Sequence, residues 1–298
     1  MRITNLTTAN SIIGSIDSLS SQQSTLQAEV ASGQKVTNPD DNPTGFNTAL
    51  NLQEDLSQVT QYASNASQAL TVAQASSSGL QSLNSISDRA GQLATLGTGT
   101  LGASAMQSYG AEVDQLIQQA VQAGNTSFNG AYLYGGTADG SPPFSTTTNA
   151  SGQITGVTYN GNASQTNIPL SSSTTVAPTT DGTTNAGIAT FINNLISLRD
   201  ALNSGSTTAV SATQSGLTTG EDLITSAIAS NGGAQTMIQA AQADQTSKTQ
   251  SLQSDLSSIV DADLPTTTVQ LSQTQTAYQA ALQSAVSTMQ LSILNYIH

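Results

Sequence analysis

Each end of this 298-residue chain carries an apolar stripe with the alternating three- and four-residue spacing of a long helix. Such a stripe lies along one side of a helix and is buried only when another helix packs against it. Neither stripe can be covered within its own segment, so the two ends must pair with each other or with neighbouring copies. The stripe residues are Ile12, Ile16, Leu19, Gln23, Leu26 and Val30 at the start, and Leu264, Thr268, Leu271, Gln275, Tyr278, Leu282, Ala285 and Met289 at the finish.

Helical spacing also fills much of the chain between these ends. Residues 44–96 predict one helix that would span roughly 80 Å at 1.5 Å per residue. Residues 106–123 predict a shorter helix that folds back antiparallel, and helical spacing resumes at 188–202 and continues toward Asp263. We expect the last stretch to be interrupted at its glycines, which are Gly205, Gly216, Gly220, Gly232 and Gly233.

Turn residues mark where the helices stop. Gly33 predicts the end of the first helix, and the Asn-Pro-Asp-Asp-Asn-Pro run at 38–43 cannot continue it. Asp40 and Asp41 are placed to cap the next helix and to complement its positive end. Asn129-Gly130, between aromatic flanks, predicts a β-hairpin with a two-residue turn.

The stretch 137–186 is rich in Ser, Thr, Gly and Asn and contains short alternating pieces, with a second Asn-Gly turn at 160–161. It predicts a small inserted β-rich domain. The expected fold is therefore mainly α, with long antiparallel helices, coiled-coil-like terminal helices, a β-hairpin near 127–135 and this insertion. The expected domains are a terminal helical layer at 1–43 and 264–298, a helical rod at 44–136 and 187–263, and the insertion at 137–186.

Composition excludes several classes of protein. Only 36% of residues are hydrophobic and 4% aromatic, which is thin for a large compact core. Five basic residues are scattered among 18 acidic ones, so nucleic acid is not expected as a partner. No run approaches the ~18 apolar residues of a membrane helix, and the first residues lack the pattern of a cleaved signal peptide. The chain has no cysteine, hence no disulfide framework.

Site chemistry is equally sparse. The single histidine is His298, which leaves no plausible base for a serine or cysteine nucleophile. Asp261 and Asp263 are better explained as a helix start than as a catalytic pair, and Pro43 interrupts a partial calcium-loop pattern. We therefore expect no enzyme activity, no cofactor and no metal, and no catalytic, cofactor-binding or metal-binding residues.

Four segments together resemble the flagellin-like family. ASGQKVTNPDDNP at 31–43 is similar to the family's turn between its first two helices, with Gln34 inserted before Lys35. NTSFNGAYLYGG at 125–136 resembles the hairpin after the third helix, and the run at 258–283 extends the resemblance toward the end of the chain. The ending MQLSILNYIH resembles the hook-associated members at the hook–filament junction, with Asn295 where an acidic residue is common and His298 beyond the usual end.

The resemblance implies a structural flagellar subunit that joins hook to filament by lattice packing of its terminal helices. Its implied partners are copies of itself in a ring, a hook-associated protein on the hook side, flagellin on the filament side, and an export chaperone. It implies export without a cleaved signal peptide and terminal helices that fold on assembly. The expected assembly interface is Ile12, Ile16, Leu19, Leu26, Val30, Leu264, Leu271, Tyr278, Leu282 and Met289.

Two alternatives remain open from the sequence. The alternative in the same class is filament flagellin itself, and seeded growth of long homopolymers would favour that assignment. A surface adhesin or glycan-binding module on a helical stalk is the alternative from another class. The insertion offers only Phe144 and Tyr159 as aromatic residues that could stack on a sugar, which argues against it.

Overall fold

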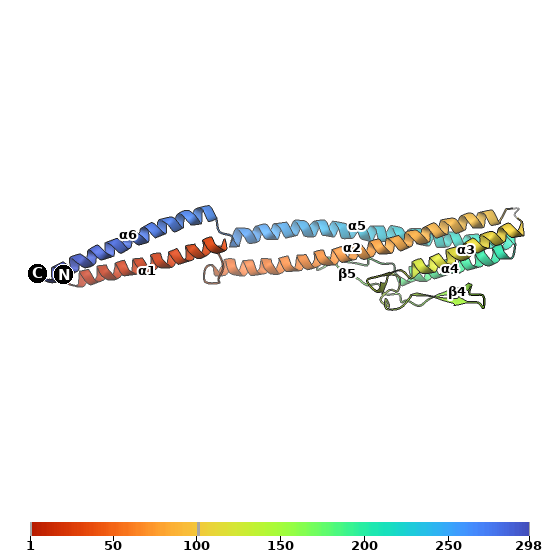
Figure 1. The fold of residues 1–298 in the computed structure, drawn as a ribbon, viewed down its shortest axis with the longest axis horizontal. Helices are drawn as coiled ribbons and strands as arrows, with labels where there is room; N and C mark the ends of the chain where they lie inside the picture. The colour runs from red at the N-terminus through yellow and green to blue at the C-terminus, as the bar shows by residue number, and fades with distance from the viewer. Residues whose placement is uncertain (1, 100–101, 298) are drawn as a thin grey trace. The chain divides into compact units, whose positions relative to one another are not determined.

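The computed structural model describes residues 2–99 and 102–297, with side chains described at residue 7, at 10–99 and at 102–288. Within these residues the chain forms six helices and three two-stranded antiparallel sheets (Figure 1). The mainly helical class predicted from the sequence is confirmed. The helices are α1 (Arg2–Ser32), α2 (Pro43–Gly97), α3 (Ala103–Gly124), α4 (Gly182–Asn203), α5 (Thr207–Val260) and α6 (Leu264–Ile297).

The chain divides into two compact units, which are described separately. One comprises Met1–Gln58 with Thr249–His298, and the other comprises Val59–Lys248. The three-part division into terminal layer, rod and insertion stays a prediction.

In the first unit, α1 and α6 pack against each other (Figure 1). Helix α1 ends where predicted, because Gly33 adopts a φ of 72° and its N–H donates to the carbonyl of Glu29 at 2.8 Å. The segments that leave α1 and α5 are then joined by backbone hydrogen bonds. Lys35 N–H donates to the carbonyl of Val260 at 2.7 Å, and Ala262 N–H donates to the carbonyl of Gly33 at 2.9 Å.

The start of α2 is capped by Asn42, not by the two aspartates predicted for that role. The Asn42 Oδ1 accepts from the Gly45 N–H at 2.9 Å. Asp41 instead closes the preceding loop, where one carboxylate oxygen accepts from the N–H groups of Asn38 and Thr37. These two backbone hydrogen bonds lower the pKa of Asp41 below its ordinary 3.8. Their stabilisation is present above that ordinary value and is lost as pH falls through the folded-state pKa.

The second unit buries its core among α2, α3, α4 and α5, with α3 and α4 in direct contact. Each helix contributes one apolar stripe, as the three-and-four spacing predicts. The largest fully buried side chains of this core are Leu80, Leu83, Leu93, Met106, Ile117, Tyr134, Phe144, Ile188, Phe191, Ile192 and Leu195.

Three short hairpins complete this unit. β1 (Ser127–Phe128) and β2 (Ala131–Tyr132) are joined through Asn129 and Gly130, both with positive φ, which confirms the predicted two-residue turn. The other strands are β3 (Phe144–Thr148), paired with β4 (Ile154–Tyr159), and β5 (Ile168–Pro169), paired with β6 (Thr175–Val176).

Helix α5 is not interrupted at its glycines, contrary to the sequence-based expectation. The chain breaks only around Gly205, at a φ of 69°, and then runs as one helix through the other four glycines. Gly220 has a packing role, because a Cβ there would lie 2.4 Å from the Phe191 ring of α4. Gly233 has open space around it.

Alanine at these two glycines should therefore change stability in opposite directions. Gly220→Ala overfills the contact with Phe191 and should lower the free energy of unfolding by about 1–3 kcal/mol. Gly233→Ala replaces a helical glycine without steric conflict and should raise it by about 0.5–1 kcal/mol. Urea unfolding followed by circular dichroism measures both. A stabilising Gly220→Ala would contradict the packing explanation.

Candidate functional site

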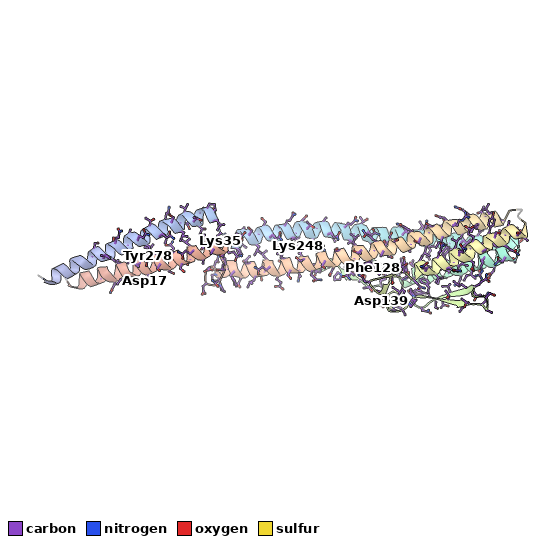
Figure 2. The ribbon with its side chains drawn as sticks, in the orientation of Figure 1. Asp17, Lys35, Phe128, Asp139, Lys248 and Tyr278 are labelled. Atoms are coloured by element: carbon purple, nitrogen blue, oxygen red, sulfur yellow. The ribbon has the colours of Figure 1, made fainter. Side chains whose placement is uncertain are left out.

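The predicted stripe of α1 is covered by helix α6 of the same chain. Leu26 is 6% exposed, and the other members of the stripe are half-buried. Figure 2 shows side chains along the pair, with the exposed Asp17 of α1 and the half-buried Tyr278 of α6 labelled. The half-buried residues of the α1 stripe are Ile12, Ile16, Leu19, Gln23 and Val30.

Helix α6 presents a different face to α1 from the one predicted. Leu271, Tyr278 and Ala285 belong to both the predicted stripe and the observed one. The other described residues of α6 that are buried or half-buried are threonine and alanine. Buried threonines are tolerated here because their hydroxyls donate one turn back, as Thr267 does to the Asp263 carbonyl at 2.9 Å. The full covered stripe is Thr267, Leu271, Thr274, Tyr278, Ala281, Ala285 and Thr288.

As a result, several large apolar side chains of α6 remain exposed. Leu264 is 45% exposed, Leu282 41% and Val286 54%. Leu264 and Leu282 are 18 residues apart, about five helical turns, and Val286 follows one turn later, so they lie along one line. We call these three residues the outer α6 stripe. Met289 lies outside the described side chains.

Further exposed apolar side chains belong to the same unit. Val269 of α6 is 56% exposed and Ile13 of α1 is 49% exposed. Apolar residues exposed together on a surface mark sites of protein association. The pair α1–α6 thus covers one stripe of each helix internally and leaves apolar side chains available on the outside.

The two aspartates before α6 have helix-end roles. Asp263 accepts from the Thr266 hydroxyl at 2.7 Å and its carbonyl accepts from the Thr267 N–H at 2.8 Å, which begins the helix. Asp261 accepts from the Ser257 hydroxyl of the preceding turn. Among the described residues, no group of three or more carboxylates or imidazoles is arranged to hold a metal ion. None of the described helices combines the length and apolar content that a membrane crossing requires.

The aromatic residues of the insertion form no surface for stacking on a sugar. Phe144 is 2% exposed, and its ring lies 5.6 Å from that of Tyr159, centroid to centroid. The Phe144 ring is therefore buried, and the half-buried Tyr159 packs against it. This arrangement argues against the glycan-binding alternative.

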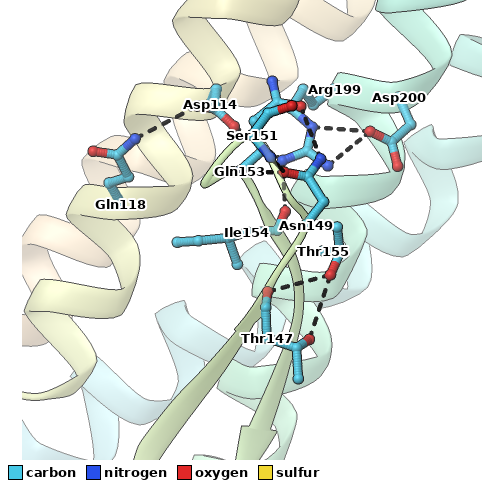
Figure 3. A network of polar contacts seen from close by, with 10 residues as sticks. All are labelled: Asp114, Gln118, Thr147, Asn149, Ser151, Gln153, Ile154, Thr155, Arg199 and Asp200. Carbon is cyan, nitrogen blue, oxygen red and sulfur yellow. Dashed lines mark hydrogen bonds and ion pairs between the residues drawn. The ribbon is translucent and has the colours of Figure 1, made fainter.

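Sequence reasoning missed the ion pairs made by the buried Arg199 of α4 (Figure 3). The Arg199 side chain is 3% exposed; Nη1 lies 2.9 Å from Asp114 of α3 and donates to the Ile154 carbonyl of β4 at 2.6 Å. Its Nη2 lies 2.8 Å from Asp200. Burial acts to lower the pKa of Arg199, but the two carboxylates outweigh it and raise that pKa. The signal in the sequence was a lone arginine inside the apolar run 195–202.

Comparison with known proteins agrees with this architecture. Residues 3–139 match the family model of the bacterial flagellin N-terminal helical region. None of the curated proteins matches the chain.

Solved structures of low sequence identity share the fold. A Vibrio parahaemolyticus protein assigned provisionally as a flagellar hook-associated protein is 16% identical, with a TM-score of 0.65 over 74% of this chain and 100% of that one. FlgL of Bacillus cereus is 20% identical, with a TM-score of 0.60 over 69% of this chain and 98% of that one. FlgL of Xanthomonas campestris is 14% identical, with a TM-score of 0.57 over 69% and 99%.

The family match covers α1, α2, α3 and the first hairpin, which are the elements that carried the resemblance in the N-terminal half. The solved structures add that the fold is shared over 69–74% of this chain. The N-terminal helical part of the chain is thus similar to bacterial flagellin, and the solved structures share its fold.

Proposed function

We propose that this protein is a structural subunit of the bacterial flagellum that joins the hook to the filament. The outer α6 stripe carries the proposal, because it leaves an apolar line exposed on the terminal helix pair. If these exposed apolar residues packed against neighbouring copies, the terminal helices would form a continuous layer held by non-covalent contacts alone. The ending Leu-Ser-Ile-Leu-Asn-Tyr at 291–296 and the fold shared with FlgL favour the junction over the filament.

The proposed partners follow from that position. Copies of the chain would form a ring, with a hook-associated protein on one side and flagellin on the other, and a chaperone would accompany export. The ten interface residues predicted from the sequence stay a prediction. Among the nine whose side chains the structure describes, Leu264 and Leu282 are more than 40% exposed. The net charge of −13 keeps unassembled subunits apart in solution.

Polar substitutions on the outer α6 stripe should impair assembly and spare the fold. Leu282→Ser with Val286→Ser removes exposed apolar surface, so we expect at least about a tenfold loss of incorporation into flagella. Gln273→Ser is the control, since that exposed residue lies about 180° around the helix from Leu282. Incorporation is measured by immunoblot of sheared flagella. Equal incorporation of both variants would contradict a role for this stripe.

Seeded polymerisation separates the junction role from that of filament flagellin. Purified subunits are added to short flagellar seeds at moderate salt and inspected by electron microscopy. A junction subunit should stay monomeric in solution and stop at the seed ends. Long filaments made of this chain alone would refute the junction role and favour flagellin.

A further inference from the structure

The hairpin β3–β4 is a sheet of only two strands, so both of its strands are edges. In an antiparallel pair, alternate residues turn their backbone N–H and C=O groups away from the partner strand. The Asn160 N–H donates to the Pro143 carbonyl at 2.8 Å, so these two residues face each other with their backbone groups pointing inward. The backbone groups of the next pair, Phe144 and Tyr159, then point outward, and the pattern alternates along the hairpin. Phe144 and Thr146 of β3 and Val157 of β4 therefore point their backbone groups outward.

Two asparagine side chains occupy two of these outward positions, Phe144 on β3 and Val157 on β4. At Phe144, the Asn125 Oδ1 accepts from the N–H at 3.0 Å and its Nδ2 donates to the C=O at 2.8 Å. At Val157, the Asn193 Oδ1 accepts from the N–H at 2.9 Å and its Nδ2 donates to the C=O at 2.8 Å. A side-chain amide thus makes the same two bonds that a residue of an added strand would make.

The rest of β3 is exposed and uncharged, so its edge could pair with another strand. Ser145, Thr146, Thr147 and Thr148 are all exposed, and β-branched residues favour extended pairing. Exposed strand edges are usually protected by charged side chains or proline. No charged residue occurs between Gly140 and Thr180, and no proline occurs within β3. A second copy of the chain carries the same neutral, exposed strand.

We propose that Asn125 and Asn193 close the two edges of hairpin β3–β4 and thereby prevent it from pairing with the same hairpin of a second copy. Asn125 directly follows α3, and Asn193 lies on α4. Both amides are consequently held by helices of the core and need no rearrangement to block a strand. Net charge alone is a weaker barrier, because salt screens it within about 10 Å at 0.1 M.

The test compares the full-length wild type with the double variant Asn125→Ala, Asn193→Ala. Sedimentation velocity over a concentration series gives the midpoint of association, and infrared amide bands report intermolecular strands. The double variant should associate at a concentration at least about tenfold lower than wild type and gain strand signal. Asn160→Ala is the control, since it removes a side-chain bond to Ser145 in the same hairpin and leaves both edges closed.

A third variant distinguishes open edges from a general loss of folding. Adding Thr146→Lys to the double variant places a charge on the exposed edge, which should block strand pairing and restore the wild-type midpoint. Circular dichroism checks that helix content is kept in every variant. A double variant that melts earlier but stays as monomeric as wild type would overturn the proposal, as would association that Thr146→Lys does not reverse.

Discussion

Replacing Arg199 by alanine should lower the free energy of unfolding of the Val59–Lys248 unit by about 3 kcal/mol. The guanidinium is almost fully buried and bonds two carboxylates and the Ile154 carbonyl. Its loss leaves that carbonyl without its charged donor and removes the packing of a long side chain. Urea unfolding followed by circular dichroism gives the change in midpoint.

Arg89→Ala is the matched control for this prediction. Arg89 makes a similar pair with Glu112, at 2.6 Å, but the two side chains are 44% and 37% exposed. Exposed ion pairs contribute little because water solvates both partners well when the pair is broken. We expect a much smaller loss than for Arg199→Ala. Similar losses of unfolding free energy in the two variants would show that the burial of Arg199 does not determine how much it stabilises the fold.

Phe191→Ala should be at least as damaging, with an expected loss of about 3–5 kcal/mol. Phe191 is fully buried in α4 and its ring lies against Gly220 of α5, so truncation leaves a cavity between the two helices. Leu96→Ala, at a residue that is 47% exposed, should change stability by no more than about 0.5 kcal/mol. The same unfolding experiment measures both variants.

The double variant Phe191→Ala, Gly220→Ala tests that contact directly. Once the ring is gone, a methyl group at residue 220 has room, so Gly220→Ala should change from destabilising to stabilising. A double-mutant cycle should therefore show strong coupling between the two positions. Simple additivity of the two single variants would contradict a direct contact.

Much of the helical framework could be predicted because it depends on local chemistry. Gly33, Asn129 and Gly130 each adopt the positive φ that their sequence context predicted. The long helix predicted at 44–96 is observed as Pro43–Gly97. In each case apolar periodicity and turn residues point to the same boundary.

Other features depend on contacts between distant segments. Glycines such as Gly220 were expected to interrupt the helix. Instead, Gly220 lies within α5 and leaves room for the Phe191 ring of α4. The tight turn between β3 and β4 lies near Gly152, whereas β4 ends at Tyr159, before the predicted 160–161 turn. Asn193 bonds Val157, and Arg199 bonds Asp114 and Ile154 besides its neighbour Asp200; these distant partners lie dozens of residues away, and only the folded chain reveals them.

The terminal helices show the same limit in the region proposed for assembly. Spacing alone correctly identified the stripe of α1, because its large apolar residues leave one choice of face. Helix α6 offers two neighbouring faces, and the one rich in threonine and alanine packs on α1. Leu282, which belongs to the stripe predicted from the sequence, is consequently exposed.

Filament growth on isolated hooks tests the proposed junction role most directly. Hooks are prepared from cells that lack this chain, the purified chain is added, and flagellin follows. Electron microscopy should show filaments only on hooks that received the chain, with an amount of it at the boundary that does not grow with filament length. Equal filament growth without the chain, or its presence along the whole filament, would contradict the account.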